Sequence, residues 1–215
     1  MKKFLSLSLA AIMLLVTFAG CDALTGMLNP TEPTRTTITE EEWLAALDCC
    51  NYTVSGSATY YEGGKQLETD TIYAKVTGSS FYRYQTSGVG LNKTEKKDYY
   101  IIIDNVNYQL VETSSGYVAN QVSAGYANEK FGDVFGANAD KLAIFACLTY
   151  NPDTKSYTGQ YIADVSITYT ITATFADGQI KSADIRRTSG TLEITYNCHS
   201  FGTTVVTLPQ YTINQ

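Results

Sequence analysis

Apolar and polar residues alternate along the C-terminal part of the chain, which is the pattern of strands with one buried face. The clearest run alternates with serine and threonine and comprises Val165, Ile167, Tyr169, Ile171, Ala173 and Phe175. The turn Ala176-Asp177-Gly178 follows it, and further runs cover residues 180–187 and 192–198. We expect residues 202–208 to add a closing strand before Pro209. Connections this short join antiparallel strands, so one face of the sheet should be covered and the other should face water.

A second group of strands precedes this one. Residues 52–60 alternate in the same way, and Glu62-Gly63-Gly64-Lys65 is typical of a hairpin turn. Further strands are predicted over residues 67–76, 79–85, 99–104, 108–113 and 117–122. Residues 87–98 are predicted to be a loop whose lysines face water. The 17 tyrosines and the many threonines agree with a β-rich fold, because both residue types fit a pleated surface.

Two helices are expected beside these strands. The first begins near Thr39, which has the spacing of a capping box with Glu42. Its apolar face would consist of Trp43, Ala46, Leu47 and Cys50. A second helix is predicted over residues 139–148, apolar most of the way round and therefore buried or lid-like. The segments together predict an α+β fold that is mainly antiparallel β.

The N-terminus has the features of a secretory signal. Lys2 and Lys3 precede an apolar run over residues 5–18, which is short for a membrane span. Ala19-Gly20-Cys21 ends this run and resembles the lipobox of bacterial lipoproteins, in which the cysteine is lipidated and becomes the first residue. The resemblance implies a signal peptide over residues 1–20 and an anchor at Cys21. It also implies a location on the extracytoplasmic face of the cell membrane.

The remaining chain suggests one tethered domain. Residues 21–37 carry two prolines and no apolar periodicity, so we expect the lipidated cysteine and a flexible tether there. Residues 38–215 have the length of a single domain. Leaving out the signal, 21 acidic residues outnumber 13 basic ones, which argues against nucleic acid as a partner. Attachment to the membrane should therefore depend on the acyl chains and not on charge.

The sequence offers no catalytic or metal-binding constellation. His199 is the only histidine, and neither a G-x-S-x-G elbow nor a cysteine-protease signature is present. The cysteines Cys49, Cys50, Cys147 and Cys198 lack the C-x₂-C spacing of zinc sites. We therefore predict a protein that is not an enzyme, with no catalytic residue, no cofactor and no metal site.

The same cysteines leave two interpretations open. Cys50, Cys147 and Cys198 fall on or near predicted apolar faces, so a disulfide could pin the first helix to the sheet or to the second helix. Alternatively, all are small buried side chains without partners. The tyrosines also allow two interpretations, a ligand-lining ladder or cross-strand pairs, and the pairs are favoured.

The order of elements over residues 39–210 resembles the LolA-like lipoprotein-carrier superfamily, and within it the LppX/LprG-type lipoproteins. The residues that carry this resemblance are the turn TFADGQI at 174–180 and the ending SFGTTVVTLPQ at 200–210. The resemblance implies a half-barrel, a curved sheet with the N-terminal helix and the mid-chain helical insertion packed on its concave face. In that family the half-barrel holds an apolar cavity for acyl chains.

Two functions of different classes are considered, of which the resemblance implies the first. The first is binding or carrying of a lipid-like ligand without catalysis, in a cavity roofed by Trp43, Leu47, Phe145 and Leu148. The second is a cell-envelope protein-interaction or sensory module with a filled core, whose partner the sequence does not identify. The first predicts an open cavity beneath the helices, and the second predicts close packing there.

Overall fold

The computed structural model describes residues 37–88, 92–137 and 139–214. Contacts divide the chain into two units, Met1–Thr37 and Ile38–Gln215, and the fold below is that of the second unit. The predicted signal peptide, Cys21 and almost all of the predicted tether lie outside the described residues. No helix among the described residues is long and apolar enough to span a membrane.

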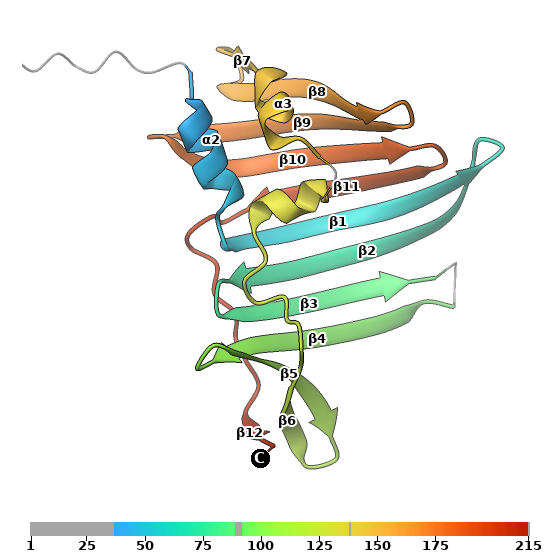
Figure 1. The fold of residues 1–215 in the computed structure, drawn as a ribbon. Helices are drawn as coiled ribbons and strands as arrows, with labels where there is room; N and C mark the ends of the chain where they lie inside the picture. Colours follow the sequence, from blue (N-terminus) through green and yellow to red (C-terminus); the bar gives the residue numbers. More distant parts are fainter. Residues whose placement is uncertain (1–36, 89–91, 138, 215) are drawn as a thin grey trace, which may run out of the picture. The chain divides into compact units, whose positions relative to one another are not determined.

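The described strands form a single twelve-stranded sheet, which is open and curved (Figure 1). They are β1 (Asn51–Glu62), β2 (Lys65–Thr77), β3 (Ser80–Ser87), β4 (Thr94–Ile103), β5 (Val106–Thr113), β6 (Gly116–Gln121), β7 (Thr149–Asn151), β8 (Ser156–Asp164), β9 (Ile167–Ala176), β10 (Gln179–Ser189), β11 (Leu192–His199) and β12 (Tyr211–Ile213). Their order across the sheet is β12-β6-β5-β4-β3-β2-β1-β11-β10-β9-β8-β7. Every pairing is antiparallel except that of β12 with β6, which confirms the predicted fold class.

Three short helices lie over one face of this sheet, which we call the inner face (Figure 1). They are α2 (Glu40–Leu47), the 3₁₀ helix η1 (Phe131–Phe135) and α3 (Lys141–Ala146). The predicted capping box is present at the start of α2. The backbone N–H of Thr39 donates to Glu42 Oε2 at 2.8 Å, and the N–H of Glu42 donates to Thr39 Oγ1 at 3.2 Å.

Glycine residues stand where the helices closely approach neighbouring elements. A Cβ atom on Gly132 of η1 would lie 3.1 Å from the carbonyl oxygen of Leu47 in α2. A Cβ atom on Gly159 of β8 would lie 2.5 Å from the carbonyl oxygen of Cys147, just after α3. A side chain at position 159 would therefore clash with the backbone, and one at position 132 would require its neighbours to shift. The side chains beneath the helices form one buried cluster with the inner face of the sheet.

The predicted closing strand over residues 202–208 is wrong. This segment forms no strand, and the chain pairs again only at β12, beside β6. On its way it covers the outer face of β4–β6, where Leu208 and Tyr211 pack against a second buried cluster that includes Ile101 and Leu110. The apolar run in β4 is thus explained, because this strand is covered on both faces.

Other boundaries also differ from the predictions. The predicted loop over residues 87–98 contains the first half of β4, which places Lys96 and Lys97 in a strand. Strands β7 and β8 were not predicted, and Val165, placed in a strand by the alternation, is fully exposed between β8 and β9. The second helix is shorter than residues 139–148, and its Leu142 is exposed.

Candidate functional site

The predicted cavity roof lies within a packed core. Trp43 and Leu47 are 0% and 1% exposed, whereas Phe145 and Leu148 are half-buried against the same cluster. The Trp43 ring centroid lies 6.3 Å from that of Phe135, and its Nε1–H donates to the carbonyl oxygen of Lys141 at 3.0 Å. The structure thus brings the four residues together but fills the space beneath Trp43 and Leu47 with side chains.

A small pocket lies at the side of α2. Glu42, Ala45 and Cys49 line it from the helix side, with residues 178–180 and 201–202 opposite. Its volume is about 260 Å³. Sites for small organic ligands usually measure about 300–1,000 Å³. This pocket is therefore at most large enough for part of such a ligand.

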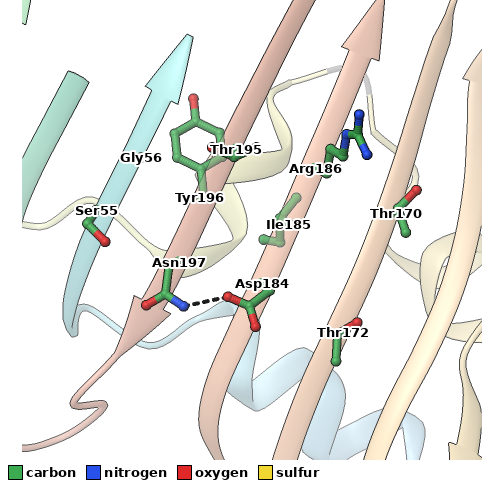
Figure 2. Close-up of a pocket in the computed structure, with 10 residues that line it drawn as sticks. All are labelled: Ser55, Gly56, Thr170, Thr172, Asp184, Ile185, Arg186, Thr195, Tyr196 and Asn197. Carbon is green, nitrogen blue, oxygen red and sulfur yellow. Dashed lines mark hydrogen bonds between the residues drawn. The ribbon is translucent and has the colours of Figure 1, made fainter. Parts of the chain in front are cut away.

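A second pocket, of about 420 Å³, lies on the outer face of the sheet. Figure 2 shows that polar side chains line it, among them Asp184, Arg186, Thr195 and Asn197. The amide nitrogen of Asn197 donates to Asp184 Oδ1, and Arg186 is paired with Glu193. Each of these charges thus has a partner within the sheet, and their exposure gives such pairs little influence on stability.

On the inner face, the part of the sheet nearer the β1–β2 and β10–β11 hairpins is only partly buried. The register places Ala58, Asp70, Ile194 and Arg187 in one row across β2, β1, β11 and β10. Ile72 and Tyr196 belong to the adjacent row, on the side of the helices. All six side chains are half-buried. We call these six residues the inner-face patch.

Two charged residues in this patch have an unusual environment. Asp70 Oδ1 and Arg187 Nε are buried atoms, and neither has a hydrogen-bond partner among the described residues. The Arg187 guanidinium carbon lies 5.9 Å from the centroid of the Tyr169 ring, a cation–π distance. Burial raises the pKa of Tyr196, while the positive charge of Arg187 acts to lower it. The guanidinium therefore lies close to an aromatic ring, and among the described residues its Nε has no hydrogen-bond acceptor.

The sequence analysis missed both residues, although their positions carry a signal. Arg187 follows Ala183 and Ile185 at two-residue spacing, and Asp70 stands in the same phase as Ile72 and Ala74. A charged residue in the apolar phase of a strand must point toward the covered face. That pattern alone would have selected the two residues for examination.

The described cysteines Cys49, Cys50, Cys147 and Cys198 are free thiols in the structure, and only Cys198 is buried, whereas the second interpretation expected all of them to be buried. Helix α2 ends at Leu47, so Cys50 does not share its apolar face as predicted. Cys147 is exposed after α3, which contradicts its predicted place near an apolar face. Cys198 is buried on the inner face, where desolvation raises the pKa of its thiol to about 12.

Alkylation should separate these thiols. We expect iodoacetamide at about pH 8 to modify Cys147 first and to leave Cys198 unmodified in the folded protein, because burial keeps that thiol protonated and inaccessible. Peptide mass spectrometry before and after unfolding in urea measures the rates at which Cys147 and Cys198 are alkylated. A peptide linking Cys198 to Cys50 or Cys147 without reductant would instead establish a disulfide.

The remaining candidates from the sequence are metal-binding groups, His199 and the tyrosines. No group of metal-binding side chains occurs within the described part of the chain. His199 is half-buried at the end of β11, with its Nδ1 2.8 Å from Ser200 Oγ. Tyrosines on neighbouring strands contact one another on the outer face, with ring centroids 6.4 Å apart for Tyr73–Tyr82 and 5.0 Å for Tyr82–Tyr99. Such contacts are the cross-strand pairs that stabilise sheets.

Neither a protein-family model nor a curated protein matches this chain. Among solved structures, the crystal structure of LprF from Mycobacterium bovis is similar to it at a TM-score of 0.38 and 11% identity. The match covers 81% of this chain and 98% of that one.

Proposed function

We propose that this protein is a lipid-anchored lipoprotein of the cell envelope that binds a lipid-like ligand without catalysis. The anchor would be Cys21, and the protein would face the outside of the cell membrane. The ligand would lie along the inner-face patch, between the helices and the hairpins. The site thus moves away from the predicted roof, where Trp43 and Leu47 are fully packed.

The half-burial of the inner-face patch carries this proposal. Three apolar side chains of the patch lie on the inner face but remain partly accessible to water, those of Ile72, Ala58 and Ile194. Beyond them in the same phase, Tyr60 is 37% exposed, and Leu192, its cross-strand partner on β11, is half-buried. Apolar side chains therefore continue from the core to the end of the sheet. A ligand with an acyl chain would remove this surface from water, which releases about 25 cal/mol per Å².

Native mass spectrometry tests this function. Residues 22–215, expressed in a bacterial periplasm, should retain acyl lipid in a defined stoichiometry and should take up a fluorescent fatty acid. Replacing Ile194 with aspartate should abolish that uptake by placing a charge in the patch, whereas the matched change Thr195→Asp on the outer face should not. Protein without added mass and without uptake would overturn the proposal.

The packing beneath the helices favours a second candidate, a protein-interaction or sensory module with a filled core. In that case the exposed apolar residues near the hairpins would contact a protein partner. These residues include Leu67, Ile162 and Val165, of which Val165 is fully exposed. The fatty-acid assay separates the two candidates, because a filled module takes up no lipid.

A further inference from the structure

We infer that Asp70 and Arg187 together recognise a zwitterionic lipid head group, one that carries a phosphate and a primary amine. This inference rests on the proposed function and gives the chemical class of its ligand. Within the inner-face patch, one acidic and one basic side chain each bury a polar atom without a hydrogen-bond partner among the described residues. Such atoms are rare in folded proteins, because a buried polar group without a hydrogen bond has lost its contact with water and gained nothing in return.

The register explains why the two charges do not satisfy each other. Asp70 is on β2 and Arg187 on β10, with β1 and β11 between them. Three strand spacings separate their backbones by about 14 Å. An arginine and an aspartate side chain span only part of that distance. The residue beside Asp70 in the row is Ala58, which has a small apolar side chain and no polar group to pair with the carboxylate.

The chemistry of the two groups selects the ligand. A guanidinium binds phosphate through directed N–H bonds, and it is the side chain best suited to that task. A carboxylate accepts hydrogen bonds from a primary ammonium group. A ligand that carries both groups would pair both charges at once and leave the net charge of the site unchanged. An anionic lipid without an amine would leave Asp70 unpaired, and a neutral lipid would leave both unpaired.

The surroundings favour a lipid over a soluble zwitterion. Ile72 and Ile194 lie beside the charged pair, and the Tyr169 ring lies beneath the guanidinium. A soluble head group would bury its own charges but would leave these apolar side chains in water. With acyl chains attached, the same head group would also cover Ile72 and Ile194.

The test uses the whole chain, purified from bacterial membranes in mild detergent and examined by native mass spectrometry. The probes are phosphatidylethanolamine, phosphatidylglycerol and diacylglycerol with identical oleoyl chains, together with soluble glycerophosphoethanolamine. We expect phosphatidylethanolamine to be retained about tenfold more than phosphatidylglycerol and about a hundredfold more than diacylglycerol, the effects of one and of two charged hydrogen bonds. Asp70→Asn should abolish the preference over phosphatidylglycerol. Arg187→Gln should reduce retention of phosphatidylglycerol to that of diacylglycerol and should lower that of phosphatidylethanolamine about tenfold.

The outer face of β10 supplies matched controls. Asp184→Asn and Arg186→Gln make the same chemical changes on the opposite face and should not alter lipid selectivity. Thermal melting of the inner-face variants establishes that they are folded, and Arg187→Lys should restore part of the phospholipid preference if charge is what matters.

The possible results are distinguishable. Equal retention of the three lipids would overturn the head-group inference and leave the proposed function standing. Absence of all lipid would overturn both. Binding of glycerophosphoethanolamine as tightly as the lipid would show a site for a free zwitterion and would overturn the lipid assignment.

Discussion

Replacing Trp43 with alanine is expected to lower the free energy of unfolding by about 3–5 kcal/mol. Its side chain is fully buried between the helices and the sheet. The ring contacts Phe135 of η1 and Phe175 of β9, with centroid distances of 6.3 and 6.4 Å. The alanine variant would lose these contacts and would leave the carbonyl oxygen of Lys141 without its indole donor. Three elements would therefore loosen together.

Leu44 provides the control for this prediction. It follows Trp43 in α2 but is 37% exposed, so Leu44→Ala should cost less than about 1 kcal/mol. Urea unfolding followed by circular dichroism measures both values. The result also bears on function. A cost for Trp43→Ala as small as that for Leu44→Ala would mean that α2 roofs an open cavity, the first of the two alternatives that the sequence left open, and would contradict the packed core.

Alternation in the sequence predicted the central strands well, because each of them buries one face only. Runs in β1, β2, β10 and β11 meet this condition, and their register follows the alternation. Alternation gave a wrong prediction where a segment rich in strand formers does not pair with the sheet. Residues 202–208 are rich in strand formers, but β1 and β11 already pair with two neighbours each, so the segment finds no free edge there.

The helices and the site show a different limit of sequence reasoning. The capping box at Thr39 acts within four residues and was predicted correctly. The space beneath the helices depends on contacts such as that of Gly132 with Leu47, which lie far apart in the sequence. No local sequence pattern predicts how closely Gly132 approaches Leu47. The inner-face patch likewise arises from residues on four strands, and only the register brings Asp70 and Arg187 into one row.

Replacing Arg83 with alanine is expected to lower the free energy of unfolding by about 3–5 kcal/mol, because it removes the main partner of a buried carboxylate. Arg83 Nη2 lies 2.6 Å from Asp98 Oδ2, and the Asp98 side chain is only 3% exposed. The guanidinium also lies over the Tyr126 ring, 5.3 Å from its centroid. Lys96 Nζ is 3.3 Å from the same carboxylate, but its side chain is 64% exposed, so water already weakens that pair.

Two further variants make this last prediction specific to the buried charge. Lys96→Ala should cost less than about 1 kcal/mol, because it removes only the exposed partner. The double variant Arg83→Met/Asp98→Leu should be more stable than Arg83→Ala, because no charge then remains buried without a partner. Urea unfolding of the four proteins completes the comparison. If the double variant were less stable than Arg83→Ala, the loss would stem from packing on Tyr126 and not from the carboxylate.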